Sequence, residues 1–197
     1  MKKVLGLIGE KGSGKQTFVN FLKEIASASP RNDGERLTIR QIRFSDILAQ
    51  TLIIWDLPIT RTNLQKLSIA MNATFGETAL ANAAKFSAEG DTAEVIILDG
   101  IRRETELELV KRMDHHILIY ITADQKLRYQ RLKKRSEKVG EVGLTFDQFM
   151  AEEKSKAEEK ILILGKFANL KIVNNGTLSD FEKKVNKFYY SYLSQAA

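Results

Sequence analysis

Short apolar or alternating runs recur along the chain, separated by longer segments with apolar residues every three or four positions. Runs of the first kind are typical of strands, and the continuous ones of strands buried on both faces of a sheet. They lie at residues 3–8, 37–44, 94–99, 116–122 and 170–174. Because helical segments alternate with these strands, the pattern predicts an α/β fold with a five-stranded parallel sheet covered by helices on both faces.

The helical segments are predicted from apolar periodicity and from residues that start or stop helices. They lie at 16–28, 45–55, 62–90 with a break near Gly76, 104–113, after Asp124, after Thr145, and at 180–193. Ser45 is expected to cap the second helix, and Thr145 with Gln148 has the spacing of a capping box. No repeat or long linker interrupts the 197 residues, so we expect a single domain, 1–197.

A glycine-rich loop, Gly9–Lys15, joins the first strand to the first helix and matches the pattern G-x-x-x-x-G-K. Glycines let backbone N–H groups turn inward around phosphate oxygens, and the helix N-terminus adds its dipole. Lys15 is expected to reach the β- and γ-phosphates of a nucleoside triphosphate. The residues predicted to hold the nucleotide here are Gly9, Lys11, Gly12, Ser13, Gly14, Lys15, Gln16 and Thr17.

The position after the lysine departs from the usual pattern. Such loops carry a Ser or Thr there, whose hydroxyl binds magnesium. Here the position is Gln16, and the hydroxyl comes one residue later, at Thr17. Direct coordination of magnesium by this hydroxyl is therefore left open by the sequence.

The overall charge agrees with an anionic ligand. Lys and Arg number 31 against 25 Asp and Glu, for a net charge of +6, and basic residues are concentrated between Lys126 and Lys138. There is no cysteine, which excludes disulfides and thiolate metal sites. No apolar run approaches the roughly 20 residues that span a bilayer. We therefore expect a cytoplasmic protein that does not contact membranes.

The sequence Gly14-Lys-Gln-Thr17 resembles the adenylate kinase pattern G-x-x-G-x-G-K-G-T, in which the hydroxyl is also displaced by one residue. The chain thus resembles the nucleoside monophosphate kinase branch of P-loop kinases, in particular archaeal adenylate-kinase-like and viral deoxynucleotide kinase members. This resemblance spans essentially the whole chain. It implies a P-loop NTPase three-layer sandwich, a helical acceptor-binding lobe at 45–90, and a short lid at 133–145. It also implies ATP and Mg²⁺ as cofactors and a nucleoside or deoxynucleoside monophosphate as acceptor.

The end of the third strand resembles a second family motif. Asp99-Gly-Ile-Arg-Arg103 is similar to D-G-F-P-R. The resemblance assigns Asp99 to the magnesium ion, together with Thr17. It assigns one arginine to the acceptor's phosphate, either Arg102 or Arg103, and we favour Arg102.

Two further segments resemble family elements that contact the donor nucleotide. Arg131-Leu-Lys-Lys-Arg135 is similar to the lid motif R-L-x-x-R, and guanidinium groups bind phosphate oxygens bidentately. The resemblance implies that Arg131 stacks on the base and that Arg135 contacts the phosphates being transferred. The loop Asn174-Asn175-Gly176 corresponds to the one that holds the base. A basic helix face and an Asn-Gly turn also occur without such a role.

The acceptor side carries shorter motifs. Phe44-Ser45-Asp46 is similar to the Ser/Thr-Gly-Asp segment that opens the acceptor lobe, although its glycine is missing. Arg61 and Gln65 lie one helical turn apart, so that the arginine is expected to hold the acceptor's phosphate and Gln65 to read a base edge. A surface arginine is the alternative.

Two other functions remain open from the sequence. The first is a P-loop kinase that phosphorylates a hydroxyl, such as dephospho-coenzyme A kinase, with Asp46 accepting the hydroxyl's proton. The second is a nucleotide-dependent RNA-binding protein, which ranks lower because no basic sheet studded with aromatic residues is apparent. The acceptor's base and sugar, the choice between ATP and GTP, and the choice between monomer and homodimer are likewise open.

Overall fold

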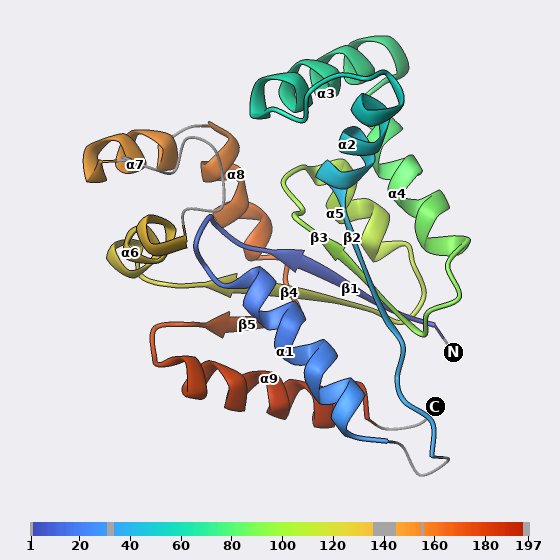
Figure 1. The fold of residues 1–197 in the computed structure, drawn as a ribbon, viewed down its shortest axis with the longest axis vertical. Coiled ribbons are helices and arrows are strands. Elements are labelled where there is room, and N and C mark those ends of the chain that lie inside the picture. Colours follow the sequence, from blue (N-terminus) through green and yellow to red (C-terminus); the bar gives the residue numbers. More distant parts are fainter. Residues whose placement is uncertain (1, 31–33, 136–144, 155, 195–197) are drawn as a thin grey trace.

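A five-stranded parallel sheet forms the centre of the molecule, in the order β2-β3-β1-β4-β5 (Figure 1). The computed structural model describes residues 2–30, 34–135, 145–154 and 156–194. The strands are β1 (Lys3–Ile8), β2 (Ile39–Arg43), β3 (Val95–Asp99), β4 (His116–Thr122) and β5 (Leu170–Val173). The helices in the described ranges are α1 (Lys15–Ala28), α2 (Phe44–Ile54), α3 (Arg61–Phe75), α4 (Ala79–Glu89), α5 (Glu104–Lys111), α6 (Gln125–Arg135), α7 (Phe146–Glu153), α8 (Lys156–Gly165) and α9 (Leu178–Tyr192).

Two apolar cores lie on opposite faces of the sheet, because successive strand residues point to opposite sides. In β1, Leu5 and Leu7 face the core formed with α1 and α9, which lie side by side in Figure 1. Val4 and Ile8 face the other core, to which α2, α4, α5 and α8 contribute. The predicted three-layer sandwich with a five-stranded parallel sheet is confirmed.

The burial of the central strands explains why their sequences are continuously apolar. Every residue of β3 is buried, and so is every residue of β1 after Lys3. Because all five strands are parallel, their carboxyl ends lie along one edge of the sheet. In register, Asp99 at the end of β3 is paired with Leu7 of β1 and Arg43 of β2. The loops that follow these strands therefore meet at this edge, where ligands bind in such sheets.

Most element boundaries agree with the predicted ones, and three details differ. Ser45 does not cap α2: the helix begins at Phe44, directly after β2, and Arg43 takes the cap position without a side-chain hydrogen bond. The segment after Thr145 forms two helices, α7 and α8. The last helix begins at Leu178 because Thr177 forms its capping box.

The other expected features of this region are only partly described. The predicted capping box is present, with the Thr145 hydroxyl accepting from the Gln148 backbone N–H at 3.2 Å. Residues 136–144, which include most of the predicted lid, lie outside the described residues. Helices α2, α3 and α4 occupy the range in which the acceptor lobe is expected (Figure 1). Of the helices described, none is long and apolar enough to cross a membrane.

Candidate functional site

The glycine-rich loop Gly9–Lys15, called the phosphate loop below, packs so closely against its neighbours that two of its positions exclude side chains. Gly12 has φ +73° and Gly14 has φ +104°, values that favour glycine. A Cβ atom on Gly12 would lie 2.6 Å from the backbone oxygen of Arg128, and one on Gly14 would lie 2.4 Å from the side-chain nitrogen of Asn174. The loop is thus held between the segments that follow β4 and β5, as a rigid cradle at the start of α1.

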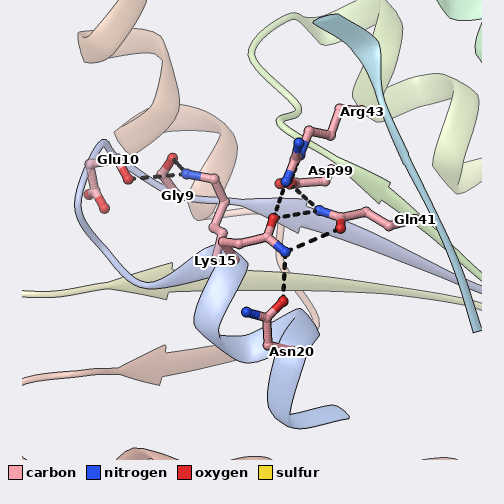
Figure 2. A network of polar contacts seen from close by, with 8 residues as sticks. Gly9, Glu10, Lys15, Asn20, Gln41, Arg43 and Asp99 are labelled. Carbon is pink, nitrogen blue, oxygen red and sulfur yellow. Dashed lines mark hydrogen bonds and ion pairs between the residues drawn. The ribbon is translucent and has the colours of Figure 1, made fainter. Parts of the chain in front are cut away.

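Lys15 points back across this loop (Figure 2). Its ammonium group donates to the backbone oxygen of Gly9 at 2.5 Å and to that of Glu10 at 3.1 Å. The charge therefore lies at the entrance to α1, whose first N–H groups lack intrahelical partners. An anion placed here would meet both the ammonium group and the helix dipole.

Glu10 is part of this loop, its side chain contacts β4, and it was not predicted as a functional residue. It is only 3% exposed. The hydroxyl of Tyr120 and, at 3.2 Å, that of Thr122 donate to its Oε1 atom, and its Oε2 atom has no partner among the described residues. Burial, followed by the hydrogen bond to Glu10, raises the pKa of Tyr120 to about 12. The carboxylate thus fastens the loop to β4.

The first arginine of the basic helix is fully used in structural contacts. Arg128 is 5% exposed, and it donates to the backbone oxygens of Ala123 and Lys11 and to the Glu153 carboxylate. Burial lowers the pKa of Arg128, but the hydrogen bond and charge of Glu153 outweigh this and hold it above its ordinary value. Together with an ion pair of 2.5 Å between Lys11 and Glu152, this contact connects α7 to the loop.

Arg131 is the predicted lid residue that the structure brings to the nucleotide site. One guanidinium nitrogen donates to the backbone oxygen of Asn174 at 2.9 Å, and the other, Nη1, is buried without a partner among the described residues. Burial lowers the pKa of Arg131. The side chain of Arg135 lies outside what the structure describes.

The predicted base loop is connected to the phosphate loop through Asn174. This side chain donates to the backbone oxygen of Ser13 at 2.9 Å, and the Asn174 backbone N–H donates to Thr122 at 2.7 Å. Asn175 accepts from the backbone N–H of Asp124 at 2.8 Å. The Asn174 amide nitrogen thus positions the backbone of Ser13, and the Asn175 side-chain oxygen positions that of Asp124. Gly176 follows, just before the cap of α9.

Gln16 belongs to a ring of polar side chains with Gln41, Arg43 and Asp99 (Figure 2). Gln41 donates to Asp99 Oδ2 at 2.8 Å and to Gln16 Oε1 at 3.1 Å. Arg43 donates to the same Gln16 oxygen and lies 3.6 Å from Asp99 Oδ2. The ring connects α1 with the ends of β2 and β3, and its two β2 residues, Gln41 and Arg43, were not predicted from the sequence.

The residues at this ring fit a magnesium ion in the type of ligand they offer. Magnesium prefers oxygen ligands and keeps several of its waters. Asp99 Oδ1 is buried without a partner in the described part of the chain, and Gln16 offers an amide oxygen. Thr17 lies one residue further, on the first turn of α1. The described residues contain no group of three or more His, Cys, Asp or Glu side chains suited to a metal, so phosphate and water would supply most ligands.

On the acceptor side, Arg103 contacts α3. Its guanidinium donates to Ser68 at 2.7 Å and to Asn72 at 3.2 Å. The buried Glu106 carboxylate accepts from the backbone N–H groups of both arginines, at 2.7 and 3.1 Å. Burial raises the pKa of Glu106, although these hydrogen bonds and charges oppose the shift.

The other predicted acceptor residues are more scattered. Asp46 is half-buried on the first turn of α2, whereas Ser45 and Gln65 are exposed. The side chain of Arg61 lies outside the described part. A small, mainly apolar pocket between α2, α3 and α4 includes Ser68 and Asn72 in its lining. Arg103 therefore touches the wall of this pocket.

Comparisons with known proteins place the chain among proteins of the same fold. No family model matches it. It is similar to a "UPF0200 protein" of Thermococcus kodakarensis, at 26% identity over 194 residues that cover 95% of this chain and 96% of that one. A "UPF0200 protein" of Sulfurisphaera tokodaii is 25% identical over 187 residues, covering 94% of both chains. These names state no activity.

Solved structures show the fold more directly. The shikimate kinase from Bacteroides thetaiotaomicron has a TM-score of 0.60 at 14% identity, covering 96% of this chain and 97% of that one. TT1252 from Thermus thermophilus has a TM-score of 0.57 at 18% identity, covering 98% and 99%. The chain has the fold of a P-loop kinase.

Proposed function

We propose that this protein is a phosphotransferase that moves the γ-phosphoryl group of ATP to a nucleoside or deoxynucleoside monophosphate. The observation that carries the proposal is the arrangement around Lys15. Its ammonium group lies across the glycine loop, at the N-terminus of α1. In the same region Asp99 keeps one buried oxygen unpartnered among the described residues.

In this reaction the donor site would act by positioning and by charge. The loop N–H groups and Lys15 would bind the β- and γ-phosphates, and Arg131 would offer its buried Nη1 to the nucleotide. Asp99 and Gln16, with Thr17 beside them, would hold magnesium. When bound, the ion neutralises charge on the phosphate oxygens.

The acceptor would be held by its phosphate. That group is already ionised, so its oxygen can attack the γ-phosphorus without a general base while the bond to the bridging oxygen breaks. Arg102 or Arg103 would bind the acceptor's phosphate, and Arg61 and Gln65 remain candidates for the same side. The contacts of Arg103 with Ser68 and Asn72 support placing it at the acceptor pocket.

A second function, phosphorylation of a small-molecule hydroxyl, is favoured by one observation. Asp46 is a half-buried carboxylate on the first turn after β2. A hydroxyl acceptor needs a group that takes its proton, and Asp46 would do this. The fold is also shared with a structure named shikimate kinase.

The test is an ADP-release assay with ATP and magnesium across the common ribo- and deoxynucleoside monophosphates, dephospho-coenzyme A and shikimate. Lys15→Ala supplies the blank. Turnover with one or a few monophosphates, retained by Asp46→Asn, supports the proposal. Turnover with a hydroxyl acceptor only, lost in Asp46→Asn, supports the second function. Absence of turnover with every acceptor contradicts both.

A matched pair of variants then locates the acceptor's phosphate. Arg102→Gln and Arg103→Gln remove neighbouring charges from the same loop. The arginine that binds the phosphate should raise the acceptor's KM at least tenfold when replaced, with little effect on the KM for ATP. The other should change both values less than threefold.

A further inference from the structure

The side chain of Arg43 lies where a bound cation would be expected. Its guanidinium donates to Gln16 Oε1 and lies 3.6 Å from Asp99 Oδ2 (Figure 2). These are the oxygen-bearing side chains that would hold magnesium. The same two residues are joined by Gln41, which donates to both. Gln16 Oε1 and Asp99 Oδ2 therefore already have the guanidinium of Arg43 beside them and each accept a hydrogen bond from the Gln41 amide.

Burial explains why Asp99 needs a cation whether or not nucleotide is present. Its side chain is 8% exposed, and a buried carboxylate without a compensating charge is strongly unfavourable. A guanidinium can satisfy several acceptors at once with its planar fork. Arg43, from the adjacent strand, donates to Gln16 with Nη2 and forms an ion pair with Asp99 through Nε at 3.6 Å.

The Arg43 side chain can also move away from Gln16 and Asp99 without disturbing the apolar core. Its side chain is 42% exposed, so the guanidinium can turn into solvent while the apolar residues of β2 stay in place. A divalent ion cannot join Gln16 and Asp99 while Arg43 remains, because like charges would then lie in contact. The two cations are therefore alternatives at the same two side chains: Arg43 donates to Gln16 Oε1 and lies near Asp99 Oδ2, and the ion would take Gln16 Oε1 and the unpartnered Asp99 Oδ1.

We propose that Arg43 is an intramolecular competitor of magnesium at Gln16 and Asp99. This rests on the proposed nucleotide binding by the phosphate loop. Without nucleotide, Arg43 neutralises Asp99 and keeps the metal site closed. The phosphates of a bound nucleotide add negative charge and ligands, and only then does magnesium displace Arg43. Magnesium entry is thereby made dependent on the nucleotide.

The test is the affinity for a fluorescent ADP analogue across a range of free Mg²⁺ at constant ionic strength, starting in EDTA. In Arg43→Gln, the Mg²⁺ concentration that gives half of the gain in affinity should fall about tenfold. The affinity in EDTA should stay within twofold of wild type. Arg40→Gln is the matched control, since Arg40 lies on the same strand but pairs with Asp91, and it should behave as wild type.

Arg43→Lys is a second variant that keeps the proposal testable if Arg43→Gln misfolds. It keeps a charge for Asp99 but lacks the planar fork, so an intermediate fall of about threefold is expected. An unchanged Mg²⁺ requirement in both variants overturns the proposal. So does weaker binding in EDTA, which would make Arg43 a ligand of the phosphates. If wild type binds the analogue no better than Lys15→Ala, the proposed nucleotide binding fails as well, and the two failures are distinguished.

Discussion

Removal of the Tyr120 hydroxyl tests how the phosphate loop is held to the sheet. Tyr120→Phe removes one donor to the buried Glu10 carboxylate and leaves that of Thr122 in place. The ring remains, and so does its packing against Gly165 and its contact with Lys171. The substitution therefore removes a single hydrogen bond and leaves the packing around the ring unchanged.

The expected loss follows from the charge and burial of the acceptor. A hydrogen bond to a charged group contributes about 1.5–3 kcal/mol, and one donor to Glu10 survives, so we expect the free energy of unfolding to fall by about 2 kcal/mol. For a chain of this size each kcal/mol shifts Tm by about 2–4 °C, which predicts a fall of about 4–8 °C.

Urea denaturation followed by circular dichroism measures this loss. Tyr190→Phe is the control: the residue is 53% exposed and its hydroxyl forms a solvent-exposed hydrogen bond with Ser29, so the change should stay within about 0.5 kcal/mol. A double-mutant cycle with Glu10→Gln should give a coupling energy of about 1–2 kcal/mol. A loss for Tyr120→Phe no larger than that of the control, with no coupling, would refute the reasoning.

The same bond has a consequence at alkaline pH. Because the pKa of Tyr120 is raised from 10.0 to about 12, the folded chain keeps a proton that the unfolded chain loses. This contribution to stability is complete below pH 10 and is lost as the pH rises toward 12. Wild type should therefore lose more stability than Tyr120→Phe between these two values, measured by the same denaturation.

Three further changes are predicted. Gly12→Ala should destabilise more than Gly34→Ala, by at least about 1 kcal/mol in urea denaturation, because both have positive φ but only Gly12 faces a backbone oxygen at 2.6 Å. Burial raises the pKa of Glu106, so above pH 4.5 the folded state holds a proton that the unfolded state releases, and stability falls as the pH rises. Glu106→Gln should reduce this fall, which is measured by urea denaturation at pH 4.5 and 7. Asn174→Ala should weaken nucleotide binding about tenfold in a fluorescence titration, because the Ser13 backbone loses its partner; unchanged affinity would contradict this.

The fold could be predicted from the sequence because its signals are local. The buried strands β1 and β3 are continuous apolar runs, and the glycine loop follows β1 directly. Capping boxes also depend on residues three apart, as at Thr145. The separation of α7 from α8 was missed, because the sequence between them contains neither glycine nor proline.

The polar contacts of the site could not be predicted, because they join residues far apart in the chain. Glu10 and Tyr120 are 110 positions apart, and Gln41 and Asp99 are 58 apart. Nothing in the local sequence distinguishes Gln41 from a surface glutamine. The choice between Arg102 and Arg103 was open for a related reason: neighbouring residues differ in direction, and only the packing of α3 shows which one reaches Ser68.

The amides of Asn174 and Asn175 bear on how this site could be redesigned. Asn174 is buried and its amide donates to Ser13, while the side-chain oxygen of Asn175 accepts from the Asp124 backbone, so neither side chain can turn toward a purine edge without giving up a contact that holds the loop. If this loop holds the donor base, we expect its selectivity to depend on the path of the backbone. An engineer who wishes to exchange ATP for another donor should therefore alter the length or curvature of the loop, because side-chain replacement at these asparagines would loosen the cradle before it changed the preference.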